Sequence, residues 1–542
     1  MRCRADGASS KSFDAEAPSR SPSKYYTLYS SGMKGAPSSS RETHPRVPSL
    51  SPPSLPRGRP LTIDEVRAEF PALTTAADPE EDHALFDGLH TNTRAGENDE
   101  DASPRRTEED LPWAFMENAG GSQVPGSVAE AVYDHMVRSY AQLGAGYPHS
   151  NRATETVRRA HDVVSTLMGV EASNPSDDGN AAGKVILGAS STQLCATLAG
   201  CFDGVVGPDD ELVVHRSGHE ANIGPWVRLA ERTGARLRWW GPGADGEAAP
   251  LDALRSALTP RTKILAVCHV SNLLGEIADL PSIVAAARRL AHPDCHVVVD
   301  GVAFAPHRAM AVADWGVDWY CCSLYKTYGP HVAAMYGSSR ALAAVTTPNH
   351  YFIDPTDVPY AFELGGVSHE ACAGVVATGD YLRRLAGGGR RDPKLKPNRS
   401  RSNEPEPEPE PLARSEVLAA FDVVTALEAA PTTALMRCLG RLEARGALRL
   451  IGPRSDDPTV RVPTVSFVPL DPAVSVHDVV AAAHAARVAI RNGNMYGVRL
   501  CEDLGVDAGA GVVRVSLVHY NTVGEVNRLA EAMEDVFGFG TD

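Results

Sequence analysis

The sequence has no excess of basic residues, no paired metal-binding cysteines and no long apolar run. Its 542 residues include 52 Lys and Arg against 68 Asp and Glu, a formal net charge of −16. Because nucleic-acid binding needs clustered cations, this balance argues against a nucleic-acid partner. The chain offers neither a GxGxxG after a first strand nor a GxxxxGK[ST] loop, so a nicotinamide or nucleotide enzyme is poorly supported. Small-molecule chemistry is favoured.

The ten cysteines form no CxxC pair and show no zinc-site spacing, so no metal site is predicted. A chain of this length needs no disulfide framework, which fits a reducing compartment. The run VVAAAHAARVAI near residue 480 is interrupted by His484 and Arg487 and predicts an amphipathic helix rather than a membrane partner. The Ser/Pro/Arg-rich start fits either a disordered tail or an organelle transit peptide. The compartment, cytoplasm or organelle, therefore stays open.

The chain divides by composition into four parts. Residues 1–60 are predicted to be a disordered tail, and residues 61–114 a short helix followed by an acidic insertion; Thr62 and Glu65 have capping-box spacing. Residues 115–375 alternate β-rich runs with helical patterns, which predicts a large α/β domain with a mainly parallel sheet. Residues 376–542 predict a smaller α+β domain, interrupted by a low-complexity, disordered insertion at about 386–415.

Reactive side chains follow four of the predicted strands, and ligands of open α/β sheets bind at the carboxyl ends of strands. CHVVVD ends at Asp300, TKILAVCHVS leads to Asn272, VDWYCCSLY delivers Lys326, and DELVVHR precedes His219. Taken singly, each residue fits an ordinary turn, cap or surface role. Together they fit pyridoxal phosphate, which needs a lysine for a Schiff base and a carboxylate beside its pyridine nitrogen.

A phosphate site is predicted in VILGASSTQLCATLAG, which reads as a strand, a small-residue turn and a helix. Free N–H groups and the dipole at a helix start favour an anion. Ser190, Ser191 and Thr192 would add hydroxyl groups.

Five motifs resemble the class V aminotransferases of fold type I, and among them the cysteine desulfurase-like proteins. They are NAGGSQVP from Asn118, HVSN from His269, VVVDGVAFAPH ending at His307, SLYKTYGPH from Ser323 and RVSLVHYNT from Arg514. The resemblance covers nearly everything except the tail and the two insertions. It implies a fold type I, pyridoxal-phosphate-dependent transferase with a large domain built on a seven-stranded sheet, and it implies a homodimer.

The resemblance also assigns roles. It makes Lys326 the aldimine-forming lysine and general acid/base, pairs Asp300 with the pyridine nitrogen, and stacks His219 on the cofactor ring. It implies that Asn272 binds the phenolic oxygen, that Ser323 binds the phosphate, and that Arg514 grips the substrate carboxylate, a task that suits a guanidinium fork. Further candidates for the substrate pocket are Arg491, Asn151, Tyr147 and His149.

The sequence departs from the family where desulfurases and selenocysteine lyases carry a sulfur-accepting cysteine. The corresponding stretch, RNGNMYG from Arg491, has Tyr496 at that position. Cys501 is an alternative acceptor, although VRLCEDLGV has a helical pattern that favours a core role. Ala303, Tyr325 and Gly366 also replace polar residues that are frequent in relatives.

We therefore expect a pyridoxal-phosphate enzyme that acts on a small amino acid through Lys326. A transaminase, racemase or lyase unrelated to sulfur, or a cofactor-binding protein without turnover, are the alternatives.

Overall fold

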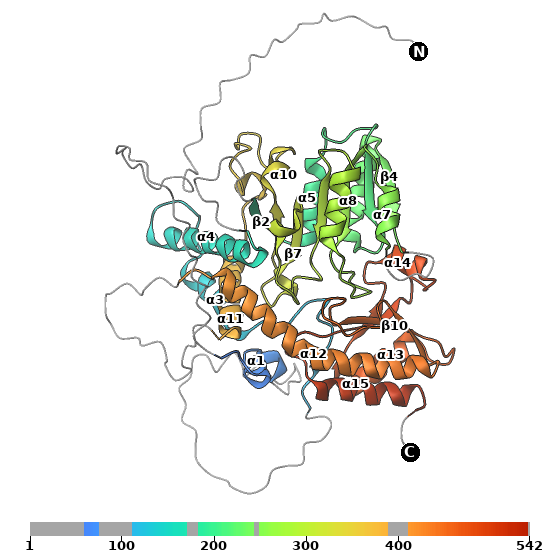
Figure 1. The fold of residues 1–542 in the computed structure, drawn as a ribbon. Helices are drawn as coiled ribbons and strands as arrows, with labels where there is room; N and C mark the ends of the chain where they lie inside the picture. Colours follow the sequence, from blue (N-terminus) through green and yellow to red (C-terminus); the bar gives the residue numbers. More distant parts are fainter. Residues whose placement is uncertain (1–58, 75–110, 171–182, 243–248, 388–409, 540–542) are drawn as a thin grey trace, which may run out of the picture.

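The computed structural model describes residues 59–74, 111–170, 183–242, 249–387 and 410–539 (Figure 1). Residues 1–58 of the predicted tail and the acidic insertion at 75–110 lie outside these residues, as does most of the insertion predicted at 386–415. α1, Ile63–Ala68, begins after Thr62 with the predicted capping box, in which the Thr62 side chain accepts from the Glu65 N–H and the Glu65 side chain accepts from the Thr62 N–H. A 3-10 turn, Pro71–Leu73, follows.

A seven-stranded sheet forms the centre of the larger part, in the order β2-β8-β7-β6-β5-β3-β4. β3 to β7 pair in parallel, whereas β8 runs antiparallel to both β2 and β7. This confirms the predicted α/β fold with a mainly parallel sheet. The strands are β2 Lys184–Gly188, β3 Glu211–His215, β4 Arg236–Trp240, β5 Thr262–Cys268, β6 His296–Asp300, β7 Trp319–Ser323 and β8 Ala333–Gly337.

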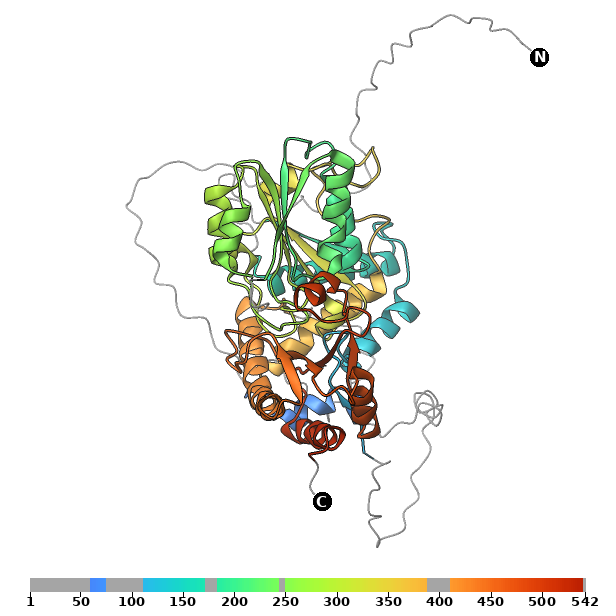
Figure 2. The same cartoon turned by 90° about the vertical axis from the view of Figure 1, so that its right-hand side faces the viewer.

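Helices cover both faces of this sheet (Figure 2). Within β6, Val297 and Val299 join one apolar core while Val298 joins the other, because successive side chains of a strand point to opposite faces. Both faces are therefore buried, which explains the continuous apolar run. The helices of this part are α3 Gly126–Arg138, α4 Pro148–Met168, α5 Ser191–Cys201, α6 Gly224–Thr233, α7 Leu251–Ala257, α8 Leu280–Leu290, α9 Val312–Trp315, α10 Ser339–Ala343 and α11 His369–Leu385.

A smaller antiparallel sheet, β12-β13-β10-β9, lies below the first in Figure 1 and packs against long helices. β1 pairs with β11, which brings residues 114–118 beside this sheet. We propose the two sheets as the centres of the two predicted domains. The elements are β1 Ala114–Phe115, α12 Arg414–Ala444, β9 Leu448–Ile451, β10 Thr464–Pro469, α13 Val476–Ala485, β11 Val488–Ala489, β12 Arg491–Gly493, α14 Val498–Asp503, β13 Val512–Ser516 and α15 Val523–Val536.

The helix predicted in VVAAAHAARVAI is α13, and it ends earlier than predicted. Arg487 adopts a left-handed conformation with φ of 52°, which reverses the chain after Ala485. Val488 then enters β11, fully buried in the core of the smaller sheet. Tertiary packing of Val488 outweighs the helical pattern there.

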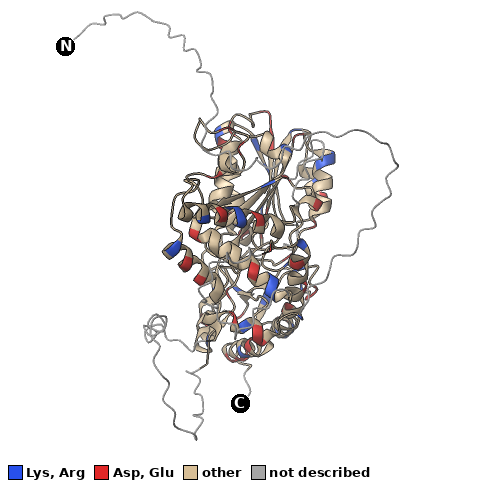
Figure 3. Cartoon of the chain, turned by 90° about the vertical axis from the view of Figure 1, so that its left-hand side faces the viewer, with Lys and Arg blue, Asp and Glu red and all other residues tan. Residues whose placement is uncertain are grey.

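α12 joins the two parts, and by length and composition it is the one described helix that is long and apolar enough to cross a membrane. Its first half contributes Val417, Phe421 and Val424 to the core of the large sheet. Its second half contributes Leu435 and Leu439 to the core of the smaller sheet. Contacts with two apolar cores are typical of a core helix, and a core helix also meets these criteria of length and composition. On the face in Figure 3, acidic and basic residues are interspersed over the helices.

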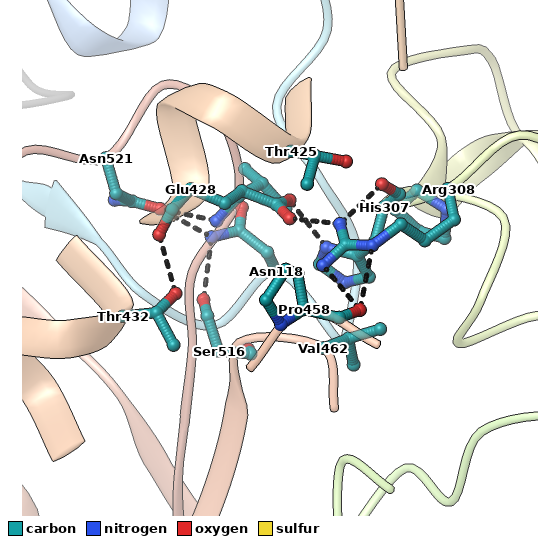
Figure 4. A network of polar contacts seen from close by, with 12 residues as sticks. Asn118, His307, Arg308, Thr425, Glu428, Thr432, Pro458, Val462, Ser516 and Asn521 are labelled. Carbon is teal, nitrogen blue, oxygen red and sulfur yellow. Dashed lines mark hydrogen bonds and ion pairs between the residues drawn. The ribbon is translucent and has the colours of Figure 1, made fainter. Parts of the chain in front are cut away.

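A buried polar network holds α12 against the large part (Figure 4). Glu428, 2% exposed, binds His307 Nδ1 at 2.6 Å and forms an ion pair with Arg308 at 2.8 Å. Arg308 also donates to the Pro458 carbonyl at 3.3 Å, which ties in the loop before β10. His307 ends the motif VVVDGVAFAPH, so this motif connects β6 of the large sheet with α12.

We expect Glu428→Ala to lower the free energy of unfolding by about 3–5 kcal/mol, because it leaves buried charge without its partner. Urea unfolding followed by circular dichroism measures this change. Glu531→Ala, at an exposed position of α15, is the control and should change stability by less than about 0.5 kcal/mol. Equal free energies of unfolding for the two variants would contradict the inference that the Glu428 contacts stabilise the fold.

Candidate active site

A pocket opens at the carboxyl ends of β5, β6 and β7, where the sequence placed its candidates. β6 is the middle strand, and its last residue, Asp300, lies opposite Cys268 of β5 and Cys321 of β7. Parallel strands carry their carboxyl ends to one edge, so residues distant in sequence meet there. The pocket is lined by Gly120, Ser190, Ser191, Thr192, His219, Ala221, Cys268, Val270, Asn272, Asp300, Val302, Ala303, Ser323, Tyr325, Lys326 and His331.

Lys326 enters this pocket from a 3-10 turn, Leu324–Lys326, that follows β7 directly. Burial, reinforced by the charge of Arg514, lowers the pKa of Lys326 to about 8, although Asp300 and Glu117 act in the opposite direction. A low-dielectric site disfavours the ammonium form. The fraction of Lys326 present as the neutral amine, the form that reacts with an aldehyde, is therefore larger near neutral pH than for an ordinary lysine.

Asp300 is 7% exposed and accepts a hydrogen bond from the Val302 N–H at 3.0 Å. Burial raises the pKa of Asp300, while that hydrogen bond and the charge of Lys326 lower it. Burial is the dominant cause, so the hydrogen bond and the charge of Lys326 only partly offset the loss of solvation of the Asp300 carboxylate. Such a carboxylate favours a cationic partner, and a protonated pyridine nitrogen is one.

His219 caps the 3-10 turn Glu220–Asn222, and its Nδ1 accepts from the Ala221 N–H at 3.0 Å. This bond places the proton of the neutral ring on Nε2. Burial, and then the charges of Lys326 and Arg514, lower the pKa of His219 to about 4, so the imidazole is uncharged at neutral pH. Its ring lies 5.0 Å from that of Tyr496, tilted by 38°.

Tyr496 sits in a tight turn that is anchored to the pocket. Met495 and Tyr496 have φ of 48° and 60°, and the Gly497 N–H donates to the Asn494 carbonyl at 2.7 Å. Asn272 Nδ2 donates to the Met495 carbonyl at 2.8 Å, and the Glu220 N–H donates to the Tyr496 carbonyl at 3.0 Å. The Tyr496 turn, which belongs to the smaller part, is thus held by two residues of the larger part, one of which lines the pocket.

The start of α5 lies at the pocket, where the sequence predicts a phosphate site. Ser190 is the N-cap and accepts from the Gln193 N–H at 3.1 Å, which leaves its hydroxyl proton available. Ser191 and Thr192 occupy the first turn and line the pocket together with Ser323 at the end of β7. The first-turn N–H groups of a helix have no intrahelical acceptors, so this rim is suited to an anion.

Arg514 lies on β13 of the smaller sheet, 3% exposed, and adjoins the pocket through its contact with Asn272, which lines it. Its guanidinium donates to the Asn272 carbonyl at 3.4 Å, and its Nε has no hydrogen-bond partner among the described residues. Burial lowers the pKa of Arg514 to about 10. Arg491 lies opposite Arg514 on β12, and the Glu117 carboxylate lies between the two arginines.

Four of the other candidates, Tyr147, His149, Asn151 and Cys501, are not among the residues that line this pocket. Asn151 lies in the first turn of α4 and donates to the Gly146 carbonyl at 3.2 Å; Tyr147 is the N-cap of that helix, and His149 lies between the two. Cys501 is fully buried on α14 among Leu273, Leu500 and other apolar side chains. Burial raises the pKa of the Cys501 thiol.

Among the departures, Ala303 and Tyr325 line the pocket, and the Tyr325 ring lies 4.5 Å from that of His331. Gly366 has φ of 84°. The sequence reasoning missed Glu117 and Gly120. The available signal was their place in ENAGG, directly before and within a motif already singled out.

Comparisons with known proteins agree with this geometry. The family model for aminotransferase class-V matches residues 114–384. The chain is 33% identical to the aminotransferase-like protein FGM3 of Gibberella zeae over 78% of this chain and 94% of that protein. It is 29% identical to the cysteine desulfurase-like protein ustD of Aspergillus flavus, over 65% of this chain and 73% of the relative.

Solved structures show the same fold. A cysteine desulfurase from Thermococcus onnurineus superposes with a TM-score of 0.64 at 20% identity, covering 79% of this chain and 95% of that one. The cysteine desulfurase CsdA of Escherichia coli gives a TM-score of 0.62 at 21% identity, over 89% and 100% of the two chains.

The fold and the family model define a pyridoxal-phosphate-dependent enzyme. The chain belongs to the aminotransferase class-V family, with cysteine desulfurase-like proteins among its relatives. Its own residues fit the cofactor: an incompletely compensated buried acid at Asp300, an amine of lowered pKa at Lys326, and an anion-binding helix start at Ser190.

Proposed function

We propose that this enzyme acts at the α-carbon of a small amino acid, with Lys326 as the residue that carries the cofactor and moves the α-proton. One observation carries the proposal: a lysine of lowered pKa and a buried carboxylate share one pocket, and a buried arginine with an unused donor adjoins it. When bound, pyridoxal phosphate supplies an electron sink that stabilises negative charge at the α-carbon.

Each residue would then have a distinct task. Asp300 would hold the cofactor nitrogen, the neutral His219 ring would lie against the cofactor, and the α5 start would hold the phosphate with Ser190, Ser191, Thr192 and Ser323. Arg514 orients the α-carboxylate of the amino acid through its free donors, which places the α-proton at Lys326. Asn272 contacts both Arg514 and the Tyr496 turn: its backbone carbonyl accepts from Arg514, and its side chain donates to the Met495 carbonyl in the turn.

The family resemblance assigns Tyr496, rather than a cysteine, to the position where desulfurases accept sulfur. Tyr496 occupies that position, and its turn is fixed by Asn272 and the Glu220 N–H. Cys501 is packed in an apolar core with a raised pKa, and a thiol rather than a thiolate is a poor nucleophile. We therefore infer chemistry at the amino acid that does not pass through a persulfide on this segment.

A second proposal concerns assembly. Tyr133, Met136 and Val137 are more than half exposed on one side of α3, and Tyr140 just beyond it is 71% exposed. Residues three, four and seven apart share one helix face. We propose that this apolar face is covered in a homodimer, as the family resemblance implies; Asn151 and Tyr147, on the neighbouring α4 segment, would then act at a partner's pocket.

An exchange experiment tests the proposed function. Cofactor-loaded protein is incubated in deuterated water with a panel of L-amino acids, and loss of the α-proton signal is followed by proton NMR. L-Cysteine with a reductant is included, with alanine and sulfide measured.

We expect α-proton exchange for at least one small L-amino acid. Exchange with none would favour the cofactor-binding protein without turnover. Alanine and sulfide from L-cysteine would show desulfuration without the usual thiol, and Cys501→Ser would then decide whether Cys501 takes part.

A further inference from the structure

Two arginines of the smaller sheet share one carboxylate at the edge of the site. Arg491 and Arg514 are direct cross-strand partners on β12 and β13. Like charges placed directly opposite each other destabilise a sheet unless an anion lies between them. Glu117 is that anion: its Oε1 lies 3.3 Å from Arg491 and 3.8 Å from Arg514.

The two contacts of Glu117 are unequal. The distance to Arg491 is that of a hydrogen bond, whereas the distance to Arg514 is that of an ion pair without one. Arg514 keeps its Nε without a partner and has only a 3.4 Å contact to the Asn272 carbonyl. Glu117 thus balances the charge of Arg514 and leaves donors of its guanidinium unused.

Backbone contacts of residues 117 and 120 position the Glu117 carboxylate beside the pocket. Glu117 forms a β-bridge with Ser516, the last residue of β13, and the Gly120 N–H donates to the Glu117 carbonyl at 2.9 Å. A Cβ on Gly120 would lie 2.3 Å from Glu117 Oε1, so a side chain there would force the carboxylate out of its present position. Gly120 itself lines the cofactor pocket.

We propose that Glu117 is a positioning residue that sets the affinity for carboxylate ligands. It serves as the resident counter-ion of Arg514, and the α-carboxylate of an amino acid displaces it from Arg514 while it stays bound to Arg491. A ligand carboxylate that makes bidentate hydrogen bonds outcompetes an ion pair at 3.8 Å. The cost of this exchange weakens carboxylate binding and speeds product release. The inference rests on the proposed role of Arg514.

The test uses the cofactor-loaded full chain and two ligands that differ only by the carboxylate, L-alanine and ethylamine. Binding is read from the absorbance change of the bound cofactor, which needs no turnover. Glu117→Gln should lower the Kd for L-alanine by about 3- to 5-fold, the upper range for a partly exposed ion pair, and leave the Kd for ethylamine within about twofold. Glu117→Asp keeps the charge and should stay near the wild type for both ligands.

Glu69→Gln is the matched control. Glu69 is also paired with an arginine, Arg384, and its side chain is 27% exposed against 26% for Glu117. It should leave both Kd values unchanged. An unchanged or raised Kd for L-alanine in Glu117→Gln, or an equal shift for ethylamine, would overturn the inference. Absence of any spectral response to either ligand in the wild type would instead contradict the proposed function itself.

Discussion

Lys326→Ala should abolish the visible absorption band of the cofactor-loaded protein and lower turnover by roughly 10²- to 10⁴-fold, the range of a lost acid–base group. The physical reason is that Lys326 lines the pocket and its pKa falls to about 8, so it is more readily deprotonated to the amine that reacts with the cofactor aldehyde than an ordinary lysine is. Borohydride reduction followed by peptide mass mapping should find the cofactor on Lys326 in the wild type.

Lys184→Ala provides the control, because Lys184 is exposed at the start of β2. It should keep both the band and the turnover. The lowered pKa adds a pH test: binding of pyridoxal phosphate to the apo protein should accelerate as pH rises toward about 8 and level off above it, because the neutral amine is the reacting form. A band that persists in Lys326→Ala would exclude Lys326 as the cofactor-bearing residue.

Arg514→Lys should raise the Kd for amino acids by roughly 30- to 150-fold, equivalent to about 2–3 kcal/mol, within the cost of disrupting a buried charged contact. Lysine keeps the charge but loses the planar fork that binds a carboxylate with two parallel hydrogen bonds. Absorbance titration with L-alanine measures this change, and ethylamine, which lacks the carboxylate, should bind as it does to the wild type.

The matched control for this substitution is Arg449→Lys. Arg449 lies on β9 in the same small sheet and donates to the Leu504 carbonyl at 3.1 Å, outside the pocket-lining set. It should leave the Kd for L-alanine unchanged. A comparable loss for ethylamine in Arg514→Lys would mean that the substitution disturbs the pocket as a whole rather than the carboxylate contact.

The combined predictions separate cofactor attachment from substrate recognition. Lys326 and Asp300 belong to the large sheet, whereas Arg514, Arg491 and the Tyr496 turn belong to the smaller one. Asn272 touches both sets. α12 and the Glu428 network fix the two sheets relative to each other, so disruption of that network should weaken substrate binding as well as stability.

The sequence alone determined the fold class and the residues at the strand ends. The apolar runs before Asp300 and Lys326 read as buried parallel strands because both of their faces are covered, and such strands must end at one edge of the sheet. The sequence also predicted two local features correctly, the capping box at Thr62 and the helix that contains Cys501. These features depend on neighbours within a few residues.

Tertiary structure alone decided what long-range packing controls. Only the cross-strand register of β12 and β13 places Arg491 opposite Arg514, and only the pairing of residue 117 with Ser516 brings a carboxylate between them. The Tyr496 turn lies on the pocket because Asn272, more than two hundred residues earlier, donates to it. Periodicity cannot encode such contacts, because sequence spacing does not fix which strand edges meet in space.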